Sequence, residues 1–452
     1  MDLWNLQCRF CFCLTSSVGY HNRTVSYVLM FPWDLSVDTL QAASIRSQEV
    51  CVMQQGAVEY LLRWRNGGTP GPYILNVRLT DACNLLCKSC DKGLDSKDRV
   101  LDRTKELSDT QLLRLIEDAA DMGVRYLLLD GGGEPLLRRG VAIRMMEEAK
   151  RRGMEGFLVT NGTLLQEKAI RTLVKIGWDH VHFSIDGPDA ATHDYLRGVP
   201  GCFNAALRNI QRMVLHREEA GTRKPQISIA TVLSNANYHR LGDMVELAHS
   251  LGIEGFYLQP LYTITPSSRA LILSDEQRAK FYEGLSEVES VACGLGLYNN
   301  LHHFHDARLV GESNRLGDVV LSDTKRAIFD IGEQFLSAPC YSSWIYLGVR
   351  PDGSIAPCPS VPAGFHGCLN IKTSSLKEIW HGHFFTHFRR RMAERELYPF
   401  CRTCCGGMVI DTRDYREAVW KRLGREQRWT PATALSQSDR EESVAGNSPR
   451  PS

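Results

Sequence analysis

From Tyr73 onward, short apolar runs alternate with amphipathic segments, and this alternation constrains the fold more than any other feature. The predicted strands are 73–79, 124–129, 156–160, 179–185, 226–233 and 255–258. The predicted helices are one that begins at the Ser108–Gln111 capping box and four more at 141–151, 166–176, 203–216 and 239–250. Strands separated by helices favour a parallel β/α architecture, and periodicity alone leaves open whether the sheet closes into a barrel or is doubly wound.

The bulk properties exclude several classes of partner. A formal net charge of +1 gives no electrostatic reason to expect nucleic acid or an anionic membrane surface as a partner. No apolar run approaches the roughly 18–20 residues of a membrane helix, and the first residues lack the pattern of a signal peptide, so a cytoplasmic location is expected. The 15 cysteines are clustered and odd in number, which in a reducing compartment favours metal binding over disulfides.

The first cysteine group follows the first predicted strand and consists of Cys83, Cys87 and Cys90. Three thiolates on one short loop can ligate three irons of a four-iron cluster and leave the fourth iron open, which is what catalysis requires. A zinc site would need a fourth nearby ligand, and residues 73–101 supply no further Cys or His. A zinc loop or three buried thiols remain the alternatives.

Further polar or glycine-rich positions lie at the ends of the next strands. They are Gly132, Gly133 and Glu134 after the second strand, Asn161 after the third, Ser184 and Asp186 on the fourth, and Arg197 beyond it. In parallel β/α folds, ligands bind at the carboxyl ends of the strands. The alternatives are structural: a tight glycine turn, internal hydrogen bonds, a loop cap at Asn161 and a surface ion pair at Arg197.

A second cysteine group begins at Cys340, which is separated by twelve residues from Gly353, and Gly353 by four more from Cys358. The group ends with Cys401, Cys404 and the adjacent Cys405. Four thiolates in two pairs can ligate one iron–sulfur cluster or one zinc ion. By chemistry alone the two are equally favoured.

The first cysteine group resembles the CxxxCxxC signature of the radical SAM superfamily, and Gly132, Gly133 and Glu134 resemble that family's GGE motif. The resemblance implies that a [4Fe–4S] cluster on Cys83, Cys87 and Cys90 binds S-adenosylmethionine and cleaves it to a 5′-deoxyadenosyl radical. It implies that the GGE residues hold the methionyl amino group and that Ser184 and Asp186 contact the ribose or methionine. Asn161 and Arg197 also match family segments, where an arginine pairs with the ligand carboxylate. An electron donor such as flavodoxin or ferredoxin is implied as a partner.

The second cysteine group resembles the opening of the SPASM and Twitch extensions of radical SAM enzymes. Because no cysteine follows Cys405, the shorter Twitch form is favoured, with one auxiliary [4Fe–4S] cluster on Cys340, Cys358, Cys401 and Cys404. Cys405 and Cys368 are possible substitutes, which leaves a second, incomplete cluster open. A fully ligated cluster of this kind is expected to transfer electrons.

The predicted fold is a partial (β/α)6 TIM-like barrel with a small C-terminal cluster-binding domain. The predicted boundaries are an extension at 1–68, the core barrel at 69–290, a connecting region at 291–339, the auxiliary domain at 340–405, and a helix with a disordered tail at 406–452. The resemblance implies an oxidoreductase that abstracts hydrogen from a peptide or protein. One alternative is dehydrogenation or rearrangement of a sugar- or cyclitol-like precursor, and another is a zinc-stabilised binding protein.

Overall fold

The computed structural model describes residues 56–93, 103–262, 265–305, 340–359 and 369–394, together with a few single positions between 361 and 422. The structural statements below concern these residues. Among their helices, none combines the length and the apolar character that crossing a membrane requires.

The described strands form one sheet in the order β7-β6-β5-β4-β3-β2-β1-β8-β9. The strands are β1 (Ile74–Val77), β2 (Tyr126–Leu129), β3 (Glu155–Thr160), β4 (His180–Ser184), β5 (Gln226–Val232), β6 (Gly255–Gln259), β7 (Tyr298–Asn299), β8 (Tyr346–Val349) and β9 (Ile355–Ala356). All neighbouring pairs are parallel except β8 and β9, which are antiparallel.

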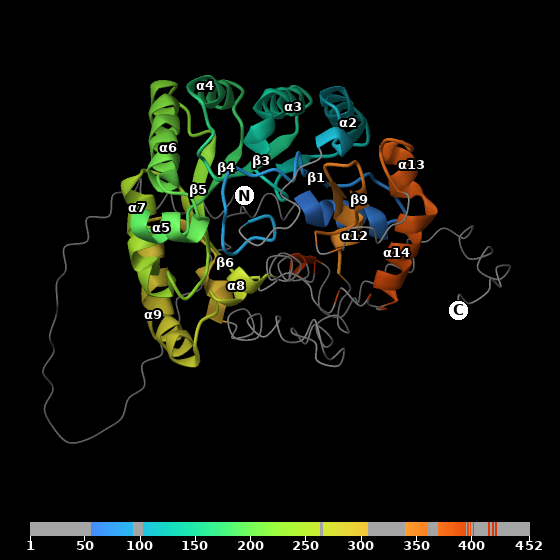
Figure 1. The fold of residues 1–452 in the computed structure, drawn as a ribbon. Helices are drawn as coiled ribbons and strands as arrows, with labels where there is room; N and C mark the ends of the chain where they lie inside the picture. The colour runs from blue at the N-terminus through green and yellow to red at the C-terminus, as the bar shows by residue number, and fades with distance from the viewer. Residues whose placement is uncertain are drawn as a thin grey trace, which may run out of the picture.

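Helices cover one side of this sheet (Figure 1). The longer ones are α2 (Asp109–Asp121), α3 (Arg139–Arg151), α4 (Glu167–Lys175), α5 (Ala190–Arg197), α6 (Cys202–Glu219), α7 (Leu241–Ser250), α9 (Asp275–Gly294) and α14 (His383–Ala393). The shorter ones are α8 (Pro266–Arg269), α12 (Ser342–Ile345), α13 (Leu376–His381), and the 3-10 turns η1 (Arg103–Lys105), η2 (Pro135–Arg138), η3 (Tyr238–Arg240) and η4 (Leu301–His305). An open, parallel sheet inside an arc of helices confirms the predicted partial barrel.

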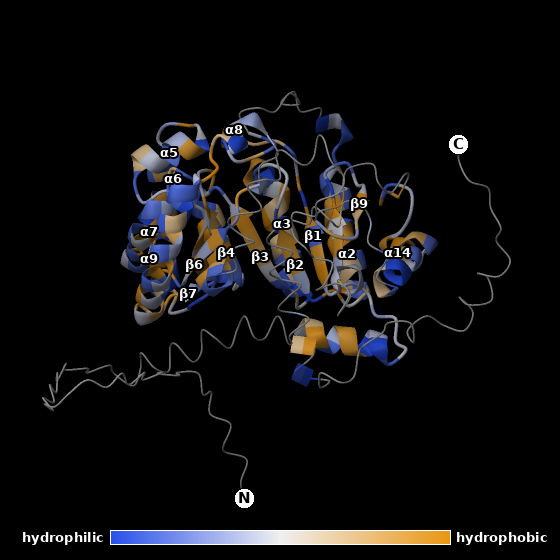
Figure 2. Ribbon diagram, turned by 90° about the horizontal axis from the view of Figure 1, so that it is seen from below, coloured by the Kyte–Doolittle hydropathy of each residue, from blue (hydrophilic) through white to orange (hydrophobic). Residues whose placement is uncertain are grey.

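The core lies between the strands and these helices. Val181 and Phe183 of β4 are fully buried, whereas the residues that alternate with them are only partly buried. This alternation follows from the two-residue period of a strand, which sends successive side chains to opposite faces. Seen from below, the strands are mainly hydrophobic and the surrounding helices carry hydrophilic residues (Figure 2).

All six predicted strands are present, within one to two residues at most ends, and the predicted capping box at Ser108 begins α2. The structure adds α5, α9 and β7, which the sequence analysis did not predict. It also adds β8, which pairs with β1 in parallel with Ile74 opposite Tyr346. The region after Cys340 therefore extends the sheet of the barrel.

A helix at residues 56–65, placed by the sequence analysis in an extension of unknown role, packs into the main core. Ala57 and Leu61 are almost completely buried, and Trp64 donates a hydrogen bond from Nε1 to the carbonyl of Trp344 at 3.1 Å. This part of the extension is thus a structural element of the barrel domain.

Asp179, just before β4, forms several hydrogen bonds at the amino-terminal end of that strand. Its carboxylate accepts hydrogen bonds from Lys150 Nζ and Lys224 Nζ, both at 2.6 Å, and from the amide of Gly156 at 2.8 Å. Burial alone raises the pKa of Asp179, but the two lysines outweigh it and the pKa is lowered.

We expect Asp179→Asn to lower the free energy of unfolding by about 3 kcal/mol at neutral pH, because two lysines then face an uncharged amide. A lowered pKa stabilises the fold above the unfolded pKa, so the deficit should persist down to about pH 3.9 and shrink below it. Denaturation followed by circular dichroism measures both effects. Asp121→Asn removes an exposed carboxylate paired with Arg152 and serves as the control that should leave stability unchanged. Equal stability of the Asp179 variant and the parent would contradict the prediction.

Candidate active site

The loop that carries Cys83, Cys87 and Cys90 follows β1 and is anchored to the end of α5. The amide of Leu86 donates to the carbonyl of Arg197 at 3.0 Å, and the amide of Lys88 donates to the carbonyl of Leu196 at 2.9 Å. The last carbonyls of a helix have no partner within the helix, so the cysteine loop satisfies them. Side chains add to this contact, because the Lys88 ammonium lies 4.0 Å from the centre of the Tyr195 ring.

The three loop cysteines are free thiols in one hydrophobic cluster, with Cys87 buried and the other two partly buried, and each sulfur has an N–H donor. The donors are the Leu85 amide to Cys83 at 3.5 Å, Arg197 Nη1 to Cys87 at 3.8 Å, and the Lys92 amide to Cys90 at 3.3 Å. Burial raises the pKa of all three thiols, that of Cys90 to about 12. Three neighbouring sulfurs that accept hydrogen bonds fit the ligand set of an iron–sulfur cluster, whose sulfurs are stabilised by such donors.

The segment Gly131–Glu134 packs directly against the start of the cysteine loop. The amide of Gly133 donates to the carbonyl of Thr80 and the amide of Glu134 to the carbonyl of Ala82, both at 2.7 Å. A Cβ atom on Gly133 would lie 1.7 Å from the Ala82 carbonyl oxygen. Gly132 has a φ of +74°, in the left-handed region. The glycines are therefore required for close contact between the two loops.

We expect Gly133→Ala to destabilise the protein by about 3 kcal/mol and to reduce its iron content, because the methyl group forces the two loops apart. Gly140→Ala is the matched control. A Cβ on Gly140 meets nothing within 4 Å, and this residue lies within α3, where alanine is the better helix former. Iron analysis and thermal unfolding of both variants test the prediction, which fails if Gly133→Ala behaves like Gly140→Ala.

The carboxylate of Glu134 links the end of β2 to the end of β3. It accepts hydrogen bonds from Thr160 Oγ1 at 2.7 Å, the Asn161 amide at 2.8 Å and the Leu136 amide at 3.1 Å. Burial raises the pKa of Glu134, and these donors lower it in part. The side chain of Glu134 thus has a structural role in aligning two strand ends.

Asn161 connects the end of β3 to the cysteine loop. Its Nδ2 donates to Asn84 Oδ1 at 2.9 Å, while its own Oδ1 accepts from the amide of Thr163 at 3.0 Å. The cap that the sequence analysis weighed for Asn161 is therefore present, together with a contact to the cysteine loop. Asn84 was not singled out from the sequence, although its place directly after Cys83 was a usable signal.

Asp186 and Arg197 form a buried ion pair beside Cys87. Arg197 Nε lies 2.8 Å from Asp186 Oδ2, and Asp186 Oδ1 accepts from the amide of Val232 at 2.9 Å. Asp186 is 2% exposed and Arg197 9%. The ion pair weighed for Arg197 is therefore present, but it is buried and not at the surface. Ser184, the last residue of β4, is partly buried on the same face as Asp186.

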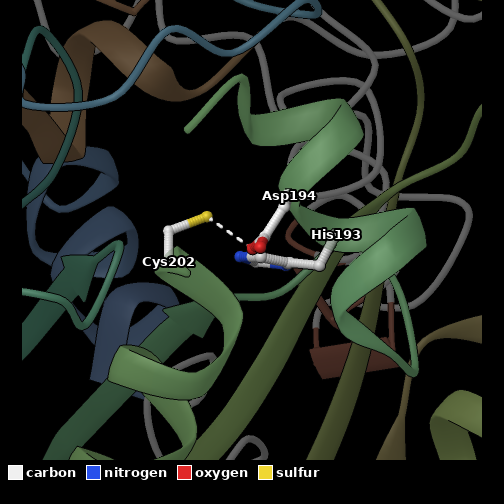
Figure 3. Close-up of side chains that lie close together, drawn as sticks. All are labelled: His193, Asp194 and Cys202. Atoms are coloured by element: carbon white, nitrogen blue, oxygen red, sulfur yellow. Dashed lines mark hydrogen bonds between the residues drawn. The ribbon is translucent and has the colours of Figure 1, made fainter. Parts of the chain in front are cut away.

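His193, Asp194 and Cys202 lie close together where α5 meets α6 (Figure 3). The amide of Asp186 donates to His193 Nδ1 at 3.1 Å, so the ring proton is on Nε2. A protonated Nε2 has no lone pair with which to bind a metal. Asp194 accepts hydrogen bonds from the Gly201 amide, the Phe203 amide and the Cys202 thiol and so caps the start of α6. Asp194 and its partners thus join α5 to the start of α6, beside the cysteine loop.

Cys340, Cys358 and Cys401 of the second group are partly buried. Burial raises the pKa of Cys401 to about 12, and the charge of Cys340 raises it further. Cys404, Cys405 and Cys368 lie outside the described residues.

Comparisons with known proteins match both cysteine groups. The model of the radical SAM superfamily matches residues 77–248, and the model of the SPASM iron–sulfur cluster-binding domain matches residues 340–405. The chain belongs to the radical SAM superfamily and carries a C-terminal SPASM domain. It is therefore an enzyme that uses a [4Fe–4S] cluster and S-adenosylmethionine, with auxiliary iron–sulfur binding in the SPASM domain, and the zinc-stabilised binding protein is set aside.

Several relatives span most of the chain. An AdoMet-dependent heme synthase of Nitratidesulfovibrio vulgaris is 25% identical over 75% of this chain and 88% of its own length. A tungsten-containing aldehyde ferredoxin oxidoreductase cofactor-modifying protein of Pyrococcus furiosus is 27% identical over 73% and 86%. The PqqA peptide cyclase of Methylocella silvestris is 26% identical over 74% and 80%. The structure of Streptococcus suis SuiB bound to S-adenosylmethionine has the same fold, with a TM-score of 0.53 at 16% identity over 74% of this chain and 72% of SuiB.

Proposed function

We propose that this enzyme abstracts a hydrogen atom from a peptide or protein and thereby matures or modifies it. The observation that carries the radical chemistry is the cysteine loop itself, in which each of three thiols accepts an N–H hydrogen bond. Such a ligand set suits a cluster with one iron left for the cosubstrate.

The proposal assigns the catalytic cluster to Cys83, Cys87 and Cys90. When bound there, the cluster and S-adenosylmethionine supply the 5′-deoxyadenosyl radical. Gly132, Gly133 and Glu134 are assigned to the methionyl group; the two glycines are partly exposed, whereas Glu134 is buried. The amides of Gly133 and Glu134 are already bonded to the carbonyls of Thr80 and Ala82, and the Glu134 carbonyl accepts from the amide of Leu137. The backbone contribution to binding is therefore assigned to the carbonyls of the two glycines.

The remaining side chains shape this site. Ser184 faces the same side of the sheet as Asp186 and is available to the ribose or methionine. Both carboxylate oxygens of Asp186 are engaged by Arg197 and Val232, so Asp186 acts through Arg197 and not on the ligand directly. Asn161 donates a hydrogen bond to Asn84 in the cysteine loop. This bond fixes the distance between the cysteine loop and Gly132–Glu134.

The proposal assigns an auxiliary [4Fe–4S] cluster to Cys340, Cys358, Cys401 and Cys404. The partial burial of Cys340, Cys358 and Cys401 supports this assignment. A fully ligated cluster can accept the electron left when a substrate radical is oxidised. A flavodoxin or ferredoxin is the proposed source of the electron for the catalytic cluster.

Two kinds of similarity bear on the substrate. The PqqA peptide cyclase among the relatives favours a peptide, and the structure of SuiB with its precursor peptide SuiA indicates that this fold accommodates one. A second candidate is a tetrapyrrole, because three of the relatives are named AdoMet-dependent heme synthases.

The test uses the full chain, reconstituted anaerobically and reduced, with S-adenosylmethionine. Short peptides encoded beside its gene are offered in one arm, and iron-porphyrin precursors in the other, both with deuterium at the candidate C–H positions. We expect deuterium in 5′-deoxyadenosine and a changed peptide mass in the first arm. Deuterium transfer to 5′-deoxyadenosine only from the porphyrin precursors would contradict a peptide substrate and support the tetrapyrrole.

A further inference from the structure

We propose that Arg197 tunes the catalytic cluster: its guanidinium donates a hydrogen bond to the sulfur of Cys87 and makes the cluster easier to reduce. This inference rests on the proposed assignment of the cluster to the cysteine loop. It gives Arg197 a positioning and electrostatic role toward a cluster ligand, distinct from the contact with the carboxylate of S-adenosylmethionine that the sequence analysis assigned to it.

The first support is the direct contact. Arg197 Nη1 lies 3.8 Å from Cys87 Sγ, which is within the range of a hydrogen bond to sulfur. Cys87 is the buried member of the three loop cysteines, and the Arg197 side chain is 11% exposed. A charged donor keeps much of its strength in such surroundings, because little water competes for it.

The second support is that the guanidinium is held from its other side. Arg197 Nε lies 2.8 Å from Asp186 Oδ2. Asp186 cannot turn away, because its Oδ1 accepts from Val232, its amide donates to His193 Nδ1 and its carbonyl accepts from Asn237 Nδ2. The His193 ring, seen in Figure 3, is itself fully buried on α5. The orientation of Arg197 is therefore set before any ligand binds.

The third support is that the cysteine loop and Arg197 are tied by their backbones. The carbonyl of Arg197 accepts from the amide of Leu86, next to Cys87. A Cβ on Gly198 would lie 2.5 Å from the Leu86 carbonyl oxygen, and Gly198 has a φ of +72°. Only glycine fits there without strain, so the donor and the sulfur keep their spacing as one unit.

The physical effect follows from charge. Reduction adds one electron from the external donor to the cluster, and the added negative charge spreads onto its thiolate ligands. A cationic N–H donor at Cys87 stabilises that reduced form more than the oxidised form. Asp186 offsets part of the charge of Arg197, but the guanidinium stands between this carboxylate and the sulfur. Arg197 itself neither gains nor loses a proton or an electron.

The experiment is an anaerobic redox titration of the full chain, read by electron paramagnetic resonance without S-adenosylmethionine. The signal of the catalytic cluster is assigned by its absence in Cys83→Ala. We expect Arg197→Gln to make reduction about tenfold less favourable, which is a shift of about 59 mV to lower potential for a one-electron couple. Arg240→Gln, which removes a partly exposed arginine paired with Asp189, should leave the potential unchanged.

A second measurement covers the case in which Arg197→Gln does not fold. Protein labelled with ¹⁵N-arginine should show nitrogen coupling to the reduced cluster in pulsed spectra, and Arg197→Lys, which keeps the positive charge, should lose it. An unchanged potential in Arg197→Gln, or an unchanged coupling in Arg197→Lys, overturns the inference. If Arg197→Gln binds S-adenosylmethionine about tenfold more weakly at an unchanged potential, Arg197 instead binds the cosubstrate. If the parent assembles no cluster on the cysteine loop, the proposed function itself is wrong.

Discussion

Replacing Cys83, Cys87 and Cys90 together by alanine is expected to lower 5′-deoxyadenosine formation to less than about one thousandth of the parent rate. The radical chemistry belongs to the bound cofactors, and without three sulfur ligands the protein cannot hold the cluster that starts it. Iron should fall from about eight to about four atoms per chain, because the auxiliary cluster keeps its own ligands. The measurements are product analysis by chromatography and iron and sulfide counting after anaerobic reconstitution.

The matched control is Cys293→Ala. Cys293 is an exposed free thiol on α9, away from both cysteine groups in the sequence, so its loss should change neither iron content nor cleavage. The hypothesis is rejected if the triple variant cleaves S-adenosylmethionine as fast as the parent, or if it retains the full iron content.

The second large effect is expected for the pair Cys340→Ala and Cys401→Ala. We expect about four irons to be lost, while 5′-deoxyadenosine still forms within about threefold of the parent rate. Turnover of the substrate should fall by about a hundredfold or more, because the electron of the substrate radical has then lost its proposed acceptor, the auxiliary cluster. Comparing 5′-deoxyadenosine with modified product in the same reaction separates the two effects.

Cys293→Ala again serves as the control. Because Cys340 and Cys401 pack against the main core, the double variant is also compared with the parent by thermal unfolding. Equal loss of 5′-deoxyadenosine and product, in a protein that remains folded, would contradict an electron-transfer role for the auxiliary cluster.

Much of the barrel could be predicted because its signals are local. The strand at Gln226 and the helix that begins after Ser108 were placed by periodicity and capping, which depend on residues a few positions apart. The helix α5 was missed because its eight residues bury only three side chains, too few to establish a period. Strand β8 gave no sign of its partner, since parallel pairing with β1 joins segments far apart in the sequence.

The candidate site divides in the same way. The spacing of Cys83, Cys87 and Cys90 already placed three thiols on one loop, and the structure adds the donors that each sulfur receives. For Asp186 and Arg197 the sequence suggested two separate ligand contacts, whereas the structure pairs them with each other. No pattern within either segment could have indicated that pair.

By itself, the sequence determined the alternation of strands and helices, the cysteine loop after the first strand, and the glycines that allow a second loop to approach it. These features depend on neighbours along the chain, where spacing fixes which side chains share a face. The tertiary structure alone decided that Arg197 reaches Cys87, that Cys340 and Cys401 pack against the main core, and that β8 extends the sheet beyond β1. Those contacts arise only when helices and strands pack, because burial and hydrogen bonding bring together residues that no local period relates.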